Sequence, residues 1–365
     1  MTKTPFDPPF LPPKIDYEKL VSEIARAHAS IGKLNGLLSR LTNPRLLSRT
    51  LTMREAVMSS QIEGTEATLS EVFEQEAKGI GKEETPKEKD FQEIINYRRA
   101  LELGIEKLQD NPLTENIIKE LHSTLLRSVR GHNRGPGEFR RKLVYIGKPG
   151  ARIEEASYVP PLPLKIPELF GDLEKYIHAD ERDVLVQIGI VHYQFEAIHP
   201  FEDGNGRIGR LLISLMLFQK NVLSYPFIYL SEFFEEHRRD YYDLLRDVSE
   251  QNDWESWLAF FLRGLDVQAQ KAQQTCQDIL DLHEKLKVRA PTLNSKYAHE
   301  FLESLFINPF FSSRTLRQRS GIRNVQTLFA LIDKFKQAEI IVDATPEKKR
   351  NKIYRFDALL EILER

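Results

Sequence analysis

Cysteine is almost absent from this sequence: Cys276 is the only one among 365 residues. A single thiol cannot form a disulfide within the chain, so a disulfide-stapled secreted fold and a zinc site built from several cysteines are both excluded. Long apolar runs are missing as well. No stretch approaches the roughly 18 uninterrupted apolar residues of a membrane-spanning helix. The N-terminal sequence has no apolar core of a secretion signal. We therefore expect a cytoplasmic protein without membrane contact.

An excess of either charge is also missing. The 52 Lys and Arg residues nearly balance the 54 Asp and Glu residues, for a net charge of −2. This balance argues against a protein that wraps nucleic acid with its whole surface and against an acidic solvating chain. Hydrophobic residues make up 41% and charged residues 29% of the sequence, as in ordinary globular proteins. At about 150 residues per domain, the length predicts two or three domains, each able to bury a core.

Helical spacing of apolar residues dominates the chain and predicts an all-α fold. The expected helices cover residues 17–47, 48–58, 68–73, 90–108, 114–126, 164–198, a stretch after 205, and 230–287. Thr114 is the expected N-cap of one of them. Residues 1–14 are rich in proline and should be extended. The charged stretch 77–90, broken by glycine and proline, is expected to be a mobile connection.

Residues 130–162 differ from the helical pattern around them. They contain several glycine and proline residues, which interrupt regular secondary structure, and a short β-like run, Leu143–Ile146. The turn residues around Lys148–Gly150 and a return near Ser157–Val159 predict a β-hairpin.

The tail from about residue 290 changes character again. Its pattern of helix, turn, helix and hairpin is typical of a winged helix-turn-helix. Residues 312–356 hold eleven Lys and Arg but four Asp and Glu, a net charge of +7. This is the footprint expected for duplex DNA, although a solvated basic dimerisation module fits the same charge.

Twelve consecutive residues, HPFEDGNGRIGR from His199 to Arg210, concentrate the chemistry of the chain. Pro200 disfavours helical geometry at the residue before it, so the preceding helix should end at His199. Histidine is the side chain best able to accept a proton near neutral pH. Gly204 and Gly206 allow a sharp turn and a close approach to a ligand.

The same segment also carries groups that suit phosphates. It leads into a helix N-terminus, where unpaired N–H groups and the dipole favour anions. Arg207 and Arg210 lie one helical turn apart, and each guanidinium presents several N–H donors in a geometry that suits phosphate oxygens. Asp203 carries a carboxylate, the kind of hard oxygen ligand that suits Mg²⁺. A P-loop motif is missing from the sequence. Each part alone could be a helix end, a turn or surface charge. Together they predict a site for a nucleotide polyphosphate, a metal ion and a general base.

The string HPFEDGNGRIGR resembles the signature of the Fic family, HxFx(D/E)GNGRxxR, at every specified position, and the likeness spans roughly residues 95–265. The resemblance implies a helical core that transfers AMP from ATP, with Mg²⁺, to a Ser, Thr or Tyr hydroxyl of a protein. It also implies that His199 is the general base and Asp203 the Mg²⁺ ligand. The nucleotide-binding residues it implies are Gly204, Asn205, Gly206, Arg207, Ile208, Gly209 and Arg210. The hairpin near 143–159 resembles the family's flap, which holds the target by strand addition.

One further feature resembles the family, and two histidines outside the motif are interpreted from their positions alone. Tyr241 and Tyr242 resemble a tyrosine pair that lines the adenine pocket, although helix packing explains them equally simply. His192 is interpreted either as support for the catalytic loop or as a buried, hydrogen-bonded histidine. His122 shows no partner pattern and is expected to be an ordinary surface or core residue.

An upstream string, Ser59-Ser-Gln-Ile-Glu63-Gly64, matches the pattern (S/T)xxxE(G/N) that marks an autoinhibitory helix in Fic proteins. A glutamate that reaches Arg210 would form a bidentate, charge-assisted pair and keep that arginine from the γ-phosphate. The alternative is that Glu63 only caps or solvates a helix end.

The sequence therefore predicts an N-terminal helical region (1–94) with the inhibitory motif, a Fic core (95–287) and a winged-helix-like domain (288–365). The leading functional hypothesis is an autoinhibited protein adenylyltransferase, whose target could include its own chain. A DNA-binding regulator with a silent Fic core stays open, as does transfer of UMP, phosphate or phosphocholine by the same fold. A homodimer is a further open prediction.

Overall fold

A computed structural model describes residues 4–39, 45–79, 85–129, 131, 133–147, 152–225 and 227–365, and for residues 45–48 the backbone alone. The helices are α1 (Val21–Leu38), α2 (Arg45–Ile62), α3 (Leu69–Lys78), α4 (Pro86–Lys107), α5 (Glu115–Leu125), α6 (Ile166–Ile177), α7 (Val184–Ile198), α8 (Asn205–Gln219), α9 (Ser231–Glu236), α10 (Arg238–Gln251), α11 (Trp254–Arg289), α12 (Ala298–Ile307), α13 (Ser313–Ser320), α14 (Val325–Gln337) and α15 (Asp357–Leu363). The strands are β1 (Phe310–Ser312), β2 (Val342–Asp343) and β3 (Ile353–Arg355). The all-α fold class is confirmed. Within the described residues, no helix is long and apolar enough to cross a membrane.

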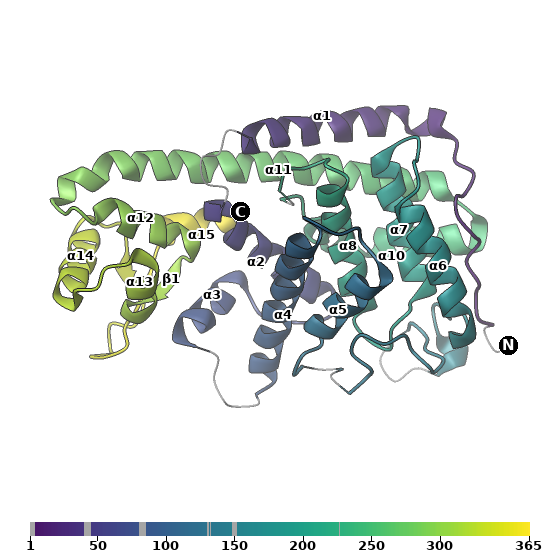
Figure 1. Cartoon of the computed structure of the whole chain (residues 1–365), viewed down its shortest axis with the longest axis horizontal. Coiled ribbons are helices and arrows are strands. Elements are labelled where there is room, and N and C mark those ends of the chain that lie inside the picture. The colour runs from purple at the N-terminus through teal and green to yellow at the C-terminus, as the bar shows by residue number, and fades with distance from the viewer. Residues whose placement is uncertain are drawn as a thin grey trace.

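One long helix, α11, runs along nearly the whole length of the molecule, and α1 lies against it (Figure 1). Below it, α4, α5, α6, α7 and α8 form a bundle in which neighbours along the chain pack together. The elements from α12 to α15 gather at the opposite end of α11 and contact α2 and α3. The helix α2 thus lies between the bundle and the C-terminal elements.

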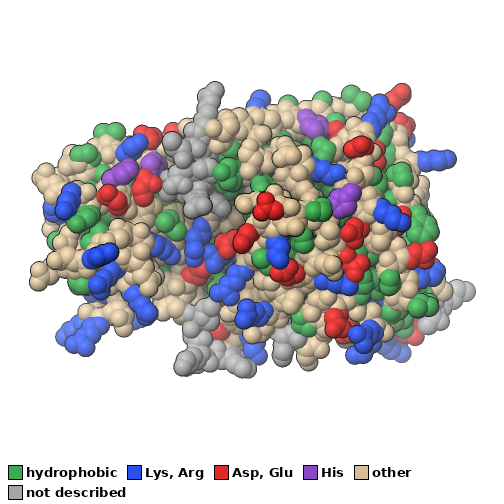
Figure 2. Space-filling model, in the orientation of Figure 1, with side chains coloured by type: hydrophobic (Ala, Val, Ile, Leu, Met, Phe, Trp, Pro, Cys, Tyr) green, Lys and Arg blue, Asp and Glu red, His purple; other side chains and the backbone are tan. Residues whose placement is uncertain are grey.

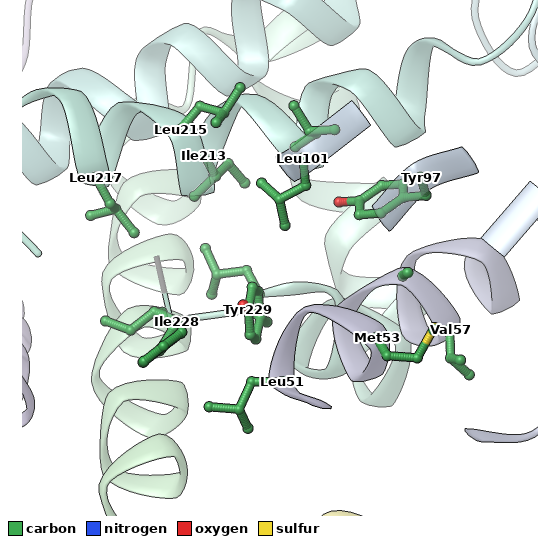
Figure 3. Close-up of a cluster of buried hydrophobic side chains, with 14 of the residues drawn as sticks. Leu51, Met53, Val57, Tyr97, Leu101, Ile213, Leu215, Leu217, Ile228 and Tyr229 are labelled. Carbon is green, nitrogen blue, oxygen red and sulfur yellow. The ribbon is translucent and has the colours of Figure 1, made fainter. Parts of the chain in front are cut away.

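The position of α2 follows from its apolar side chains. Figure 3 shows Leu51, Met53 and Val57 of α2 beside buried side chains of α4 and α8. The facing residues labelled there include Tyr97, Leu101, Ile213 and Leu215, and all of these side chains are buried. Burying apolar surface contributes about 25 cal/mol per Å². This packing therefore holds α2 against the helices that carry the catalytic motif.

Several helix boundaries differ from the sequence predictions. The helix expected over 17–47 ends at Leu38, and the next one reaches Ile62 instead of stopping near residue 58. Thr68 and Thr114 cap α3 and α5 through their side chains, as their positions predicted for the starts of these helices. The connection expected over 77–90 is shorter, because α3 continues to Lys78 and a capping box at Thr85 starts α4. Residues 80–84 lie outside the described residues.

The β-hairpin predicted over 143–159 is confirmed in the antiparallel pairing of its two sides and is wrong in extent, because they form a bridge instead of a ladder. A single antiparallel bridge joins Ile146 to Tyr158. The expected turn at 148–150 lies outside the described residues. Two short strands without an apolar face to pack are marginal in water, and Leu143 and Tyr145 are exposed. The return segment is held instead by the N-terminal segment, because the N–H of Phe6 donates to the carbonyl of Val159 at 2.9 Å.

The C-terminal elements contain the expected helix, turn, helix and hairpin. β2 and β3 pair antiparallel, and β1 pairs with the other edge of β3, in the order β1-β3-β2. Figure 2 shows Lys and Arg side chains at the lower left, over these elements. Several of the basic side chains have internal partners: Lys334 donates to main-chain carbonyls, and Lys352 and Arg355 pair with aspartates. The net charge of the segment therefore overstates the cations available to a ligand.

Candidate active site

His199 lies where α7 stops. Its backbone takes the left-handed conformation, with φ 49° and ψ 61°, and Pro200 follows it. The side chain is 19% exposed. Burial and the positive charge of Arg140 lower the pKa of His199 to about 4. The imidazole is therefore neutral at neutral pH and can accept a proton.

Two buried side chains hold the loop that follows His199. The side-chain amide of Asn205 makes two hydrogen bonds with the backbone of Phe201. It donates to the carbonyl at 2.9 Å and accepts from the N–H at 2.8 Å. His122 accepts from the N–H of Gly137 through Nδ1 and therefore donates through Nε2 to the carbonyl of Asp203, at 2.9 Å. Burial lowers the pKa of His122 to about 4, and its ring stacks on Phe201 at 3.8 Å. His122, which carried no signal in the sequence, thus positions the metal-binding candidate.

The N-terminus of α8 presents main-chain N–H groups toward the site. Its N-cap is Gly204, with φ 79° and no side-chain cap, so the first N–H groups of the helix remain open to a ligand. A Cβ on Gly206 would lie 2.5 Å from Oε1 of Glu63 and 3.0 Å from Nη1 of Arg210, so a larger residue would displace the Glu63–Arg210 contact. Ile208 and Gly209 do not face this region: Ile208 belongs to the core, and Gly209 faces Glu196.

Asp203 and Arg207 form one ionic network. Arg207 is buried and pairs with Glu93 at 3.1 Å and with Asp203 at 3.2 Å. The other oxygen of Asp203 pairs with Arg134 at 3.2 Å. Within the part of the chain that the structure describes, no group of three metal-ligating side chains occurs. A lone carboxylate suits Mg²⁺ that is shared with phosphate oxygens and water, and it does not suit a closed all-protein metal site.

Arg210 has all its described contacts on the inhibitory segment. Its Nη2 donates to Oε1 of Glu63 at 2.8 Å and to the carbonyl of Ser59 at 2.9 Å, and its Nε donates to the Ser59 hydroxyl at 2.9 Å. The expected bidentate pair is therefore wrong in detail: one carboxylate oxygen is used, because Ser59 occupies Nε. Glu63 directly follows α2, and Gly64 turns the chain with φ 96°.

The Glu63 carboxylate stands where an anion would approach α8. Burial alone would raise the pKa of Glu63, but Arg210 outweighs it and holds the pKa below its ordinary value. The carboxylate is therefore ionised at neutral pH. It lies over Gly206, at the positive end of the helix dipole.

A cavity of about 960 Å³ opens beside this cluster, a size that suits a nucleotide-sized ligand. It is lined by Ile146, Gly147, Glu155, Ser157, Tyr158, Tyr193, Glu196, Ala197, Arg238, Tyr242, Leu245, Arg246 and Ser249. Of the two tyrosines predicted to line a pocket, Tyr242 does so and is 43% exposed. Tyr241 is 1% exposed and stacks on Phe234, so helix packing explains it.

His192 connects Tyr241 to α8. Its Nδ1 contacts the carbonyl of Gly209 at 3.0 Å, and its Nε2 contacts the Tyr241 hydroxyl at 2.9 Å. A carbonyl can only accept, so Nδ1 carries the proton and Nε2 accepts from the tyrosine. Burial lowers the pKa of His192 to about 3. His192 is therefore a buried, neutral, hydrogen-bonded histidine.

Arg140 and Glu93 are further site residues that the sequence did not reveal. Arg140 donates to the carbonyls of His199 and Pro161, which ties the catalytic loop to the segment that follows Tyr158. Glu93 reaches Arg207 from 114 residues away. No local spacing signals such contacts, because each depends on how distant helices pack.

The chain resembles known proteins along much of its length. Residues 21–106 match the profile described as Fic/DOC family N-terminal, and residues 112–217 match that of the Fic/DOC family. A probable protein adenylyltransferase of Aquifex aeolicus is 26% identical over 206 residues, which is 55% of this chain and 56% of that protein. The protein adenylyltransferase Fic of Culex quinquefasciatus is 32% identical over 117 residues, which is 31% of this chain and 20% of that protein. The match thus spans less than two thirds of either relative.

Solved structures share the fold. A Fic family protein from Desulfovibrio desulfuricans superposes with a TM-score of 0.60 at 23% identity, over 95% of this chain and 98% of that one. A Fic domain containing signaling protein from Bacteroides thetaiotaomicron superposes with a TM-score of 0.54 at 20% identity, over 70% of this chain and 97% of that one. At these identities the likeness concerns the fold alone.

Proposed function

Because the chain belongs to the Fic/DOC family, we propose that it is a protein adenylyltransferase that Glu63 holds inactive. The reaction moves AMP from ATP to the hydroxyl of a Ser, Thr or Tyr side chain, in the cytoplasm. The observation that carries this proposal is the contact of Glu63 with Arg210. The Glu63 carboxylate lies at the N-terminus of α8, near a histidine that is neutral at neutral pH, and this arrangement supports the proposal.

In this mechanism His199 accepts the proton of the target hydroxyl. The hydroxyl oxygen then bonds to the α-phosphorus of ATP, and the bond from that phosphorus to the bridging oxygen breaks, so that pyrophosphate leaves. The open N–H groups at the start of α8 face the phosphate oxygens, and Arg207 adds positive charge. Asp203 would hold Mg²⁺, which supplies charge neutralisation on the phosphates. The cavity beside Tyr242 takes the adenine.

Inhibition follows from competition for Arg210. A γ-phosphate needs the donors that now contact Glu63 and Ser59. The Glu63 carboxylate also repels a triphosphate at the same helix end. Removing it leaves Arg210 in place, because Ser59 still accepts two hydrogen bonds.

Intact-protein mass spectrometry after incubation with ATP and Mg²⁺ tests the proposal. The samples are wild type, Glu63→Gly and Glu63→Gly/His199→Ala, with Glu66→Gly as the control that removes a neighbouring exposed glutamate. We expect an AMP-sized gain, on the chain itself or on a supplied protein extract, in Glu63→Gly alone. An AMP-sized mass gain in the double variant would show that His199 is not the general base. A mass gain with UTP or another donor, and none with ATP, would show that a group other than AMP is transferred. An equal rate in wild type would remove the inhibitory role.

The C-terminal segment supports a second candidate activity, the binding of duplex DNA through residues 312–356. Basic side chains at the hairpin turn are exposed, namely Lys348, Lys349 and Arg350. The outward face of α14 carries Gln326, Phe329 and Asp333 instead of cations. Contact with phosphates therefore fits better than base recognition. The full chain and its Lys348→Ala/Lys349→Ala/Arg350→Ala variant should differ in duplex binding at low salt and in salt dependence. No binding by the wild type at low salt would leave a role in contacts with proteins, including a homodimer.

A further inference from the structure

Glu196 is a buried carboxyl that the catalytic motif does not include. It lies in the last turn of α7, three residues before His199, and its Oε2 is 4.0 Å from Nδ1 of that histidine. Its side chain is 12% exposed. In the described part of the chain, neither Oε1 of Glu196 nor Nδ1 of His199 has a hydrogen-bond partner. A buried, unsatisfied carboxyl oxygen is costly, so its retention calls for an explanation.

The neighbouring helix is shaped around this carboxyl. A Cβ on Gly209 of α8 would lie 2.2 Å from Oε1 of Glu196, so any other residue there would force the carboxyl group to move. The family signature leaves residue 209 unspecified, yet glycine is the residue that fits beside Glu196. The carboxyl is therefore confined between the imidazole and the backbone of α8, at the wall of the 960 Å³ cavity.

The charges around the pair act on the two groups in different ways. Burial raises the pKa of Glu196 to about 7, against the opposing effect of Arg210 from α8, while Glu63 raises it further. Tyr241 and Tyr242 of α10 also face the carboxyl and are neutral, since burial raises both of their pKa values. His199, with Arg140 beside it, has its pKa lowered to about 4. Near neutral pH the imidazole is thus unprotonated, whereas the carboxyl changes charge.

We infer that Glu196 is a positioning residue whose ionised carboxylate stabilises the imidazolium of His199 as it forms. This inference rests on the proposed transfer reaction. The O–H bond of the target hydroxyl breaks, its proton goes to the imidazole, and the resulting positive charge lies opposite the Glu196 carboxylate. An unpaired charge in a buried site is costly, and an opposite charge about 4 Å away offsets that cost. Catalytic contacts are often long before substrate binds and tighten with it.

Kinetics over a range of pH test the inference in full-length protein carrying Glu63→Gly. Its transfer rate should rise with pH as Glu196 ionises, with a midpoint at or below about 7, because Glu63 no longer raises the pKa of Glu196. Adding Glu196→Gln should leave the rate at pH 6 nearly unchanged and lower the rate at pH 8 about tenfold, which flattens the rise. Glu202→Gln, which removes a carboxylate from the same loop, should keep the rise. Equal pH profiles with and without Glu196→Gln would overturn the inference.

A second measurement separates this inference from the proposed function. The ring signal of His199, identified by its loss in His199→Ala, should shift in a step near pH 7 when followed by NMR with labelled histidine. Glu196→Gln should remove that step. A step that persists in Glu196→Gln would overturn the pairing even if transfer occurs. If Glu63→Gly shows no transfer but the step disappears in Glu196→Gln, the pairing stands and the proposed function fails.

Discussion

Two carboxylate–arginine junctions lie at opposite ends of α2. At its C-terminal end, Glu63 contacts Arg210 and is 37% exposed. Near its N-terminal end, Glu76 of α3 is 11% exposed and accepts from Arg49 and Arg98, and also from Asn308 of the C-terminal segment. The same two chemical groups therefore meet in different surroundings.

The difference lies in solvent access and in the number of partners. Glu63 is partly exposed and pairs with one arginine, so a competing anion can reach that arginine and replace the carboxylate. Glu76 accepts from two arginines and an asparagine, which lie on α2, on α4 and just after α12, so a competing anion would have to displace three partners. Arg210 is itself 2% exposed, so only the carboxylate side of the first pair is open to solvent, whereas both sides of the second pair with Arg98 are buried. The contact of Glu63 with Arg210 can therefore be replaced by a ligand. The contacts of Glu76 form a permanent joint that holds α2, α3, α4 and the C-terminal elements together.

Glu76→Ala is the strongest test of this comparison. It leaves the buried Arg98 with only its longer contact to the half-exposed Glu102, at 3.7 Å, so the free energy of unfolding should fall by about 3 kcal/mol or more. Urea denaturation measures the loss. Glu74→Ala is the control: it removes a carboxylate from the same helix that pairs with Lys78 at the surface, and it should cost less than about 1 kcal/mol. Equal losses in the two variants would contradict the permanent joint.

Glu63→Gly should change the rate of AMP transfer more than it changes the free energy of unfolding. We expect AMP transfer to rise by about tenfold or more, which corresponds to about 1.4 kcal/mol. The free energy of unfolding should fall by less than in Glu76→Ala, because Ser59 still accepts two hydrogen bonds from the buried Arg210. Initial rates and urea midpoints, compared with Glu66→Gly, separate the two effects. A large loss of stability without a gain in rate would make Glu63 a structural residue.

Glu55 lies on α2 between the two junctions and predicts a pH dependence. Burial raises its pKa to about 7. A raised pKa means that the stability is fully present below the ordinary pKa of glutamate and is lost as pH rises through about 7. Glu55→Gln keeps an acceptor for Tyr97 and Ser231. It should therefore reduce the stability lost between pH 5 and pH 8 by about 1 kcal/mol or more. Urea midpoints across that range check it, and an unchanged slope would rule out Glu55 as the titrating group.

Substitution of Arg319 in α13 should have the smallest effect on the free energy of unfolding. Burial and the like charges of Arg49 and Arg98 lower its pKa, to about 10, and its Nη1 is buried without a partner in the described chain. Arg319→Met should change the free energy of unfolding by less than about 1 kcal/mol, or raise it, because the like charges separate. Arg98→Met, measured beside it, should lose several times more. A comparable loss in both would place Arg319 inside the joint.

Local signals predicted the parts of the molecule that depend on neighbouring residues. Pro200 ended α7 at His199, and Thr68 and Thr114 marked helix starts, because caps and proline act within one turn. The predicted hairpin is reduced to one bridge, between Ile146 and Tyr158, since strand pairing also needs a surface to pack against. The partners of His122 and Arg207 were not predicted, because they lie 81 and 114 residues away in the chain.

The sequence by itself determined the all-α class, the loop between two helices and the chemical groups of the catalytic and inhibitory motifs. These are contiguous, so backbone geometry and residue type suffice. Only the tertiary structure decided that Ser59 shares Arg210 with Glu63, that Tyr241 is packed while Tyr242 lines the cavity, and that Glu196 stands behind His199. Burial and distance set the charges of these groups, and both arise when distant helices pack together.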